Sequence, residues 1–301
     1  MKGLNGLIMR DAIAALKMVK GAAIMLFIDA LNEDGWDAWL RLKRKKDIII
    51  ITQSPETEAA LDGLRKEFKA IVRLPKARLT RMGYLKLSLI MCITEGLIRG
   101  KDKIISVTGA CGSGALDTMM VLDVDKETEV FSAMGNIRGL FRHIRPAVLE
   151  AALSIAIELS SEGREGRSVG ATFVIGDHEK VLGLSRPLIM NPFKGYAEDL
   201  RNILNHDMRE SIKEYALLDG AFVVREDGVV MSAGVHLDAA LEDEGLTPGL
   251  GCRHMAAAGI TDVTDAAAIT ISGSTGIVRI FRKGRVVVEI ERPQRNVDRP
   301  A

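Results

Sequence analysis

The first 110 residues alternate between two sequence periods, and this alternation constrains the fold more than any other feature. Four short apolar runs predict buried strands, at residues 22–29, 47–52, 70–74 and 103–108. The stretches between them suit helices, at residues 35–45, 54–68 and 80–99. Ser54-Pro55-Glu56 is a good helix start, because Ser caps, Pro fits the first position and Glu suits the dipole. Strand–helix alternation of this kind predicts a parallel α/β sandwich, with helices on both faces of the sheet.

The second half has a different pattern, which predicts a mixed sheet with helices. Helices are predicted over 146–162, over about 196–217 and from just after Arg253. Strands are predicted over 169–176, 181–184, 221–225, 229–235, 266–272, 277–281 and 286–290. The turn Glu226-Asp227-Gly228 indicates a hairpin between two of them. We therefore predict an α/β domain over 1–125, a mixed-sheet α/β domain over 126–292 and a tail over 293–301.

The composition bears on which partners the protein can bind and in which cellular compartment it is expected. The 301 residues suit two domains, and 41 basic against 40 acidic residues argue against a nucleic-acid-binding protein. Cys92, Cys111 and Cys252 are too widely spaced for a disulfide framework or a zinc site. Since no run of about 18 apolar residues occurs, no membrane span is expected. A cytoplasmic location is the simplest expectation.

Leu218-Asp219-Gly220-Ala221 stands directly before an apolar strand. An Asp among small residues leaves room for a large ligand, and its carboxylate can hold a divalent metal or take a proton. The same letters are also common in a plain helix-to-strand turn.

Residues 249–257 read Gly-Leu-Gly-Cys-Arg-His-Met-Ala-Ala. A glycine-rich approach to a helix start exposes backbone N–H groups that favour phosphate. Arg253 adds a planar fork of donors, and His254 can donate one more hydrogen bond. A simple helix cap is the alternative.

Two further loops contain small and hydroxyl residues. Ser272-Gly273-Ser274-Thr275-Gly276 lies between two predicted strands and suits either phosphate oxygens or a hairpin. Residues 109–114 (GACGSG) follow a predicted strand but lack the Gly-Lys-Ser/Thr ending of a P-loop. That second loop is either a strand-to-helix turn or a regulatory anion site.

The order of these segments resembles the catalytic domain of the diadenylate cyclase family, which carries an Asp-Gly-Ala motif and an Arg-His-Arg motif followed by Ala-Ala. The resemblance covers residues 146–290 and includes 164–196, 218–221, 251–265 and 271–276. The first half resembles the C-terminal α/β domain of pyruvate kinase, which is the arrangement of the archaeal-type diadenylate cyclases.

The resemblance implies an enzyme that condenses two ATP into cyclic di-AMP and two pyrophosphates across a face-to-face pair of domains, and so at least a dimer. It implies catalytic roles for Asp219, Gly220, Ala221, Arg253 and His254. It also implies a metal role for Asp219, with Mg²⁺ or Mn²⁺ as the divalent cation. The residues implied to contact ATP are Leu237, Gly251, Cys252, Arg253, His254, Ser272, Gly273 and Ser274.

The sequence departs from the family pattern at two places. Met255 stands where the family usually has its second Arg, and Gly273 and Ser274 stand where many members have acidic residues. Asp219 is then expected to need help from water, phosphate oxygens or a residue such as Asp262. A non-catalytic sensor that binds ATP or cyclic di-AMP is therefore the alternative function.

Overall fold

The computed structural model describes residues 3–31, 45–124, 126, 141, 143–164, 168–239 and 251–291. The chain divides into two compact units. Unit 1 comprises residues 1–76, 85–129 and 134–139, and unit 2 comprises 77–84, 130–133 and 140–301. The predicted helix over 35–45 lies almost entirely outside the described residues, as do the tail over 293–301 and most of the stretch that holds the predicted domain boundary. The predicted domain limits stay predictions.

Unit 1 is built on a five-stranded sheet with the order β3-β2-β1-β4-β5. The strands are β1 (Ala23–Phe27), β2 (Ile48–Thr52), β3 (Ala70–Arg73), β4 (Lys103–Thr108) and β5 (Thr118–Asp123). The first four are parallel, which confirms the prediction for them. The edge strand β5 was not predicted and runs antiparallel to β4.

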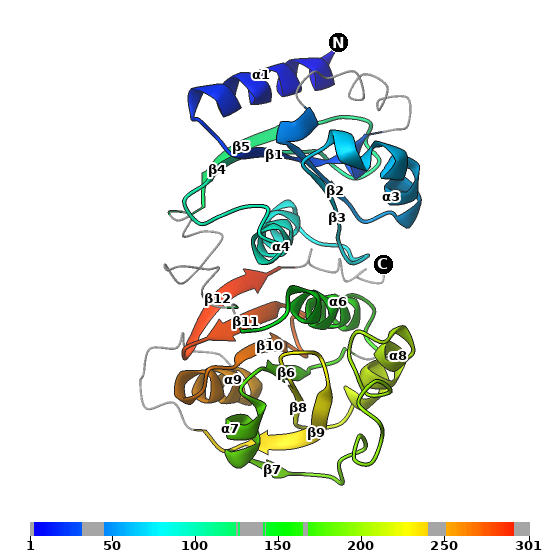
Figure 1. The fold of residues 1–301 in the computed structure, drawn as a ribbon, viewed down its shortest axis with the longest axis vertical. Coiled ribbons are helices and arrows are strands. Elements are labelled where there is room, and N and C mark those ends of the chain that lie inside the picture. The colour runs from blue at the N-terminus through cyan, green and yellow to red at the C-terminus, as the bar shows by residue number, and fades with distance from the viewer. Residues whose placement is uncertain are drawn as a thin grey trace, which may run out of the picture. The chain divides into compact units, whose positions relative to one another are not determined.

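Helices cover both faces of this sheet. Helix α1 (Leu4–Met18), which was not predicted, packs Met9, Ala12 and Leu16 into one core together with α3 (Pro55–Leu61) and η3 (Asp62–Glu67). Ser54 caps α3 as predicted, because its side chain accepts a hydrogen bond from the Thr57 amide. The opposite sheet face is also buried, and Figure 1 shows α4 (Arg81–Thr94) on that side.

The loop over 109–114 connects two antiparallel strands, so the predicted strand-to-helix turn is wrong. The Gly112 and Gly114 amides donate to the carbonyls of Asp29 and Ala30, at 2.8 and 2.9 Å. These amides hold the loop against the end of β1. Partial desolvation raises the pKa of the exposed Cys111 thiol, with a smaller contribution from the charge of Asp29, which reduces its reactive thiolate fraction.

Unit 2 is built on a seven-stranded sheet. Its mixed character was predicted, whereas the strand over 185–187 was not. The strands are β6 (Thr172–Ile175), β7 (Ser185–Pro187), β8 (Ala221–Val224), β9 (Val230–Leu237), β10 (Ala267–Ile271), β11 (Val278–Arg282) and β12 (Arg285–Ile290). Their order is β12-β11-β10-β6-β8-β9-β7. β6 and β8 pair in parallel, whereas the neighbouring pairs are antiparallel.

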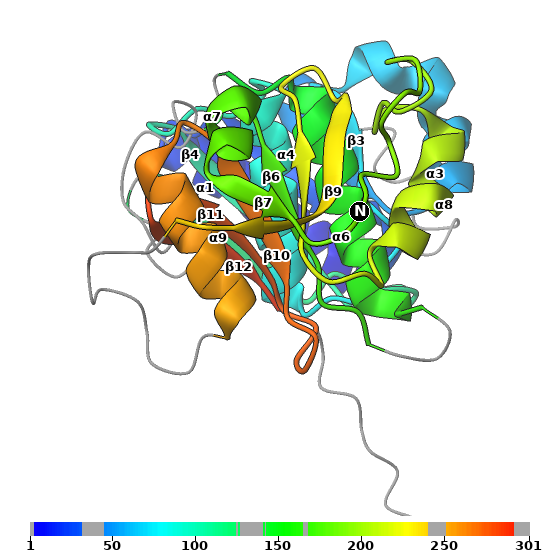
Figure 2. The same ribbon diagram turned by 90° about the horizontal axis from the view of Figure 1, so that it is seen from below.

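Two long helices flank the sheet of unit 2. Helices α6 (Pro146–Glu162) and α9 (Cys252–Val263) lie on opposite faces, as Figures 1 and 2 show. Helix α9 buries Ala257, Ala258 and Ile260 in one apolar cluster with alternate strand residues such as Val223 and Phe281. This packing fixes the first turn of α9 against the sheet, where the predicted site residues stand.

Two predictions in unit 2 are wrong. Residues 181–184 were predicted as a strand, but α7 (His178–Gly183) is a single short helix that buries Val181, so an apolar run this short does not distinguish the two. The helix predicted over about 196–217 is confined to α8 (His206–Tyr215), because Asn205 caps it. Among the described helices, none combines the length and the apolarity that crossing a bilayer requires.

Candidate active site

The site forms where the turn before β8 meets the first turn of α9. Arg253 Nη2 donates to Asp219 Oδ1 at 3.0 Å, so the structure joins the two strongest sequence motifs. The Asp219 side chain is 81% exposed and that of Arg253 37%. Both groups are therefore reachable by a ligand.

Gly220 allows the backbone of this turn to lie directly against β9. Its φ is +100°, a conformation that side chains disfavour. A Cβ here would stand 2.8 Å from both the Gly234 carbonyl carbon and the Val235 nitrogen. Only Gly at this position allows that approach, which sets the position of Asp219. Ala221 then begins β8 and is buried.

The guanidinium of Arg253 lies beside Gly170, and Gly170 in turn lies against Gly273. A Cβ added to Gly170 would lie 3.0 Å from Arg253 Nη1 and 3.2 Å from the Gly273 nitrogen. The start of α9 and the loop after β10 therefore both approach the stretch before β6 at Gly170. Arg253 Nε is buried and has no hydrogen-bond partner in the described part of the chain.

The N-terminus of α9 provides backbone donors beside Arg253. Gly251 is the N-cap, and the amides of His254 and Met255 donate to its carbonyl. The preceding amides of Cys252 and Arg253 have no acceptor within the helix, as at every helix start. Together with the helix dipole, these amides favour a phosphate group.

His254 is buried, with 6% of its surface exposed. Its Nε2 lies 3.1 Å from Arg279 Nη1. Burial, and next the positive charge of Arg279, lowers the pKa of His254 to about 4. The ring is therefore neutral at physiological pH, and its Nδ1 has no partner among the residues that the structure describes.

The loop after β10 is a tight turn. Ser272 Oγ accepts from the Thr275 amide at 3.3 Å and lies 3.3 Å from Ser274 Oγ. The Gly276 amide closes the turn on the Ser272 carbonyl at 2.8 Å. Ser272 is buried, whereas Ser274 is exposed. The turn brings Gly273 against Gly170, and the phosphate role of its hydroxyls stays a prediction.

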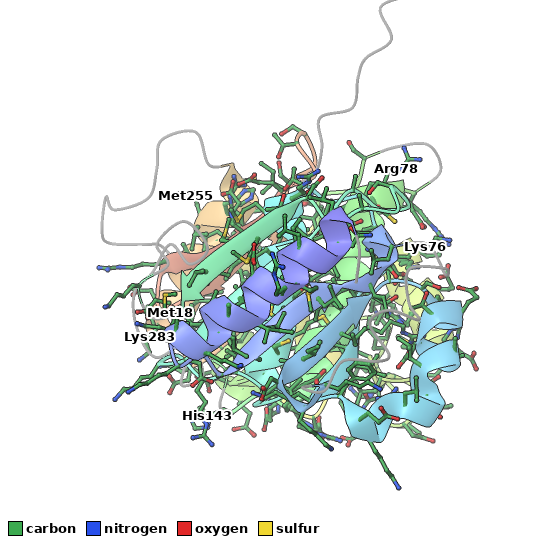
Figure 3. All side chains as sticks on the ribbon, turned by 90° about the horizontal axis from the view of Figure 1, so that it is seen from above. Met18, Lys76, Arg78, His143, Met255 and Lys283 are labelled. Carbon is green, nitrogen blue, oxygen red and sulfur yellow. The ribbon has the colours of Figure 1, made fainter. Side chains whose placement is uncertain are left out.

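Leu237 ends β9 and is 6% exposed, and its side chain packs in the apolar cluster under α9. Any contact with a base at Leu237 must therefore come mainly from backbone groups, and the role of Leu237 in binding ATP stays a prediction. Met255 is labelled in Figure 3, and 42% of its surface is exposed. No cation enters the site from this position.

A metal site in this region would rest on Asp219 as its carboxylate. The described residues contain no group of three or more His, Cys, Asp or Glu side chains that could hold a metal ion. Asp262 cannot assist Asp219, because it lies in the last turn of α9 beside Gly284, roughly 13 Å along the helix from Arg253. One exposed carboxylate still fits Mg²⁺, which proteins often bind through one or two carboxylates and substrate phosphates.

Sequence reasoning missed Gly170 and Arg279. Gly170 lies inside the strand predicted over 169–176, where a glycine signals a close approach by another segment. Arg279 breaks the apolar run of β11, and a charged residue on a buried strand face indicates a buried partner. Neither signal identifies the partner, which depends on the tertiary fold.

Comparisons with known proteins bear on both halves of the chain. Residues 158–286 match the family described as DisA bacterial checkpoint controller nucleotide-binding, and residues 4–131 match the probable sensor domain DacZ_P. The site in unit 2 thus lies within a match to a nucleotide-binding domain.

Two individual relatives support the same family. A diadenylate cyclase from Methanocaldococcus jannaschii is 37% identical over 202 residues, which are 67% of this chain and 63% of that protein. A diadenylate cyclase from Haloferax volcanii is 36% identical over 203 residues, which are 65% of this chain and 71% of that protein. The match therefore spans just under two thirds of the first relative. A solved structure of DacA from Staphylococcus aureus is 19% identical, covers 49% of this chain and 84% of that chain, and has a TM-score of 0.29.

The family match and the relatives together define the class as the diadenylate cyclases, which confirms the resemblance seen in the sequence. This chain belongs to the diadenylate cyclase family. The likeness of unit 1 to the pyruvate-kinase domain stays a prediction.

Proposed function

We propose that this protein condenses two ATP molecules into cyclic di-AMP and releases two pyrophosphates. The observation that carries the proposal is the 3.0 Å contact between Asp219 and Arg253, because it places a carboxylate and a phosphate-binding cation in one exposed site. The names of the two relatives, both diadenylate cyclases, support the same reaction.

Each unit 2 holds one ATP by its phosphates. Arg253 binds phosphate oxygens through its exposed guanidinium, and the Cys252 and Arg253 amides add donors at the start of α9. His254 is neutral and acts as a hydrogen-bond donor, not as a cation. Ser272 and Ser274 provide hydroxyls at the neighbouring loop.

The reaction consists of the same step taken twice. The 3′-oxygen of one ATP attacks the α-phosphorus of the other and forms a new P–O bond. The bond from that phosphorus to the bridging oxygen of pyrophosphate breaks, and the hydroxyl proton is lost. Asp219 faces solvent beside Arg253, where its carboxylate orients the hydroxyl and takes up the proton.

A divalent cation completes the proposed site. Asp219 and the nucleotide phosphates would hold Mg²⁺ or Mn²⁺. When bound, the ion supplies positive charge that offsets the negative charge growing on the phosphate oxygens. Arg253 provides a fixed part of the same stabilisation from the protein.

Two copies of the domain must face each other, because one domain with one ATP cannot make a cyclic dinucleotide. A two-fold axis through the paired sites satisfies this requirement. Exposed apolar side chains stand on the segments next to Asp219 and suit such a contact. Leu218 precedes Asp219, and Leu188 donates its amide to Gly234, the residue against which Gly220 lies. Met190 is 93% exposed two residues further on.

The test is incubation of the purified full chain with ATP and either Mg²⁺ or Mn²⁺, with products identified by chromatography and mass. Cyclic di-AMP with pyrophosphate is the expected result. ATP binding without product, with both metals and over a range of protein concentrations, would instead support the sensor function. Met255 and Gly273 would then be the first positions to change toward the family pattern.

A further inference from the structure

Arg279 lies outside every motif of the sequence, yet it contacts the ring of His254. It stands on β11, and its side chain is 14% exposed. Arg279 Nε donates to Glu289 Oε2 at 2.7 Å, which fixes the guanidinium from the β12 side. Its Nη1 lies 3.1 Å from His254 Nε2.

The chemistry of this contact determines where the ring hydrogen lies. A guanidinium has donors and no acceptor, so Nε2 of His254 must accept the hydrogen bond. A neutral imidazole carries one ring hydrogen, which is then on Nδ1. A second ring proton would place an imidazolium N–H against a guanidinium N–H, two like charges in a buried setting.

We propose that Arg279 is a positioning residue that holds His254 as the Nδ1–H tautomer, so that the ring offers one N–H donor to a phosphate oxygen bound at the start of α9. The phosphate part of this proposal rests on the proposed function. His254 Nδ1 is buried and has no partner in the described chain, as expected of a donor that a ligand completes.

The strand pairing of the sheet fixes Arg279 on the face that α9 covers. Arg279 pairs with Thr270 on one side and Glu289 on the other, so the three residues share one face of the sheet. Phe281, two residues further along β11, packs into the cluster under α9, which shows that this face is the one covered by the helix. The cation next to His254 therefore comes from the sheet, whereas the family pattern places one at position 255.

The first experiment reads the tautomer directly in the full chain without nucleotide. The protein is labelled with ¹⁵N at its five histidines, and long-range ¹H–¹⁵N correlation spectra report which ring nitrogen carries hydrogen. The His254→Gln spectrum identifies the His254 signals. The proposal requires hydrogen on Nδ1 of His254 in the wild type, and hydrogen on Nε2 overturns it, whether or not an Arg279 variant folds.

The second experiment compares three variants by the same spectra and by ATP affinity. Arg279→Met should move the hydrogen to Nε2 or to a mixture and weaken ATP binding about 10- to 100-fold, as loss of one hydrogen bond to a charged group does. Arg279→Lys should keep most of both properties because it retains a donor. Arg285→Met, a loss of an exposed cation on β12, should match the wild type.

A folded Arg279→Met protein with the wild-type tautomer or the wild-type ATP affinity would overturn the positioning role. Failure of the proposed function is distinguishable, because it appears as ATP binding without cyclic di-AMP while the tautomer spectra stay as stated.

Discussion

Asp219 and Arg253 form an exposed ion pair that matters to the proposed reaction much more than to folding stability. Their ion pair is 81% and 37% exposed, so it contributes about 0–1 kcal/mol to folding. The turn that carries Asp219 is set by glycine and by β9, not by this pair. Changes at Asp219 should therefore act on the reaction and leave the fold intact.

Asp219→Asn keeps the shape of the side chain and removes its charge. We expect cyclic di-AMP synthesis to fall by about 100-fold or more, since the group that orients the hydroxyl and holds a cation is lost. The melting temperature should stay within about 2 °C of the wild type. Asp199→Asn, at another exposed Asp of unit 2, is the matched control. Near-normal turnover in Asp219→Asn would remove Asp219 from the mechanism.

The pH dependence of stability follows from His254. Burial and the charge of Arg279 lower its pKa from 6.5 to about 4, with Arg253 acting in the same direction and Glu289 opposing. Between pH 6.5 and about 4, His254 is protonated in the unfolded chain but not in the folded chain. The free energy of unfolding therefore decreases as pH falls through this range. The full effect is about 3 kcal/mol.

Urea unfolding of the wild type and of His254→Gln at a series of pH values measures this contribution. Carboxylates that titrate in the same range affect both proteins alike, so the readout is the difference between them. We expect the stability of the wild type relative to the variant to be greatest above pH 6.5 and to shrink toward pH 4. A difference that does not change with pH would contradict the buried, neutral ring.

At the scale of elements, β8 and β9 fix the site through their backbones. Gly220 approaches the Gly234–Val235 segment too closely for any Cβ, and Gly234 itself has a φ of +65° against Ile189. The Asp-Gly-Ala motif is thus a structural requirement as well as a chemical one, because the small residues allow the strand contact that orients Asp219.

Gly220→Ala tests this role of the element. The positive φ alone costs about 1–3 kcal/mol, and the Cβ at 2.8 Å from backbone atoms adds to it. We expect a lower urea midpoint and a loss of turnover larger than the unfolded fraction explains. Gly183→Ala, where a Cβ meets nothing within 4 Å, should change neither quantity. Equal behaviour of the two variants would show that the close approach does not set the site.

Elements were predictable from the sequence where the residues that determine them lie close together along the chain. The start of α3 was predictable, since Ser54 and Pro55 act within one turn. The start of α9 was placed within two residues for the same reason. Helix α7 was missed because it holds a single buried apolar residue, Val181, which a strand would also bury. Arg279 was missed because only the pairing of β10, β11 and β12 under α9 brings it to His254.

At the scale of the whole molecule, the sequence predicted the α/β class, the mixed sheet of the second half and the meeting of two motifs. Asp219 and Arg253 are 34 positions apart, and their contact at 3.0 Å depends on β8 and α9 lying side by side. The order of the motifs predicted that the two residues lie close together, because the resembled family implies a fold as well as a set of motifs. The unpredicted antiparallel strand β5 and the cradle of Gly170 depend on long-range packing, which local patterns do not encode.

The last prediction concerns assembly. If each unit 2 holds one ATP, the rate of cyclic di-AMP synthesis per molecule must rise with protein concentration and level off once dimers predominate. Initial rates at saturating ATP are measured alongside sedimentation velocity over the same concentrations. The midpoint of the rate increase should coincide with the midpoint of the monomer–dimer transition.

Met190→Asp should shift both midpoints to higher concentration, because it puts a charge on an exposed apolar position near the proposed interface. Met18→Asp, at an exposed methionine of α1 in unit 1, is the matched control and should leave both unchanged. A rate per molecule that is constant while the protein sediments as a monomer would exclude the paired mechanism, because a single domain with a single ATP has no second α-phosphate to attack.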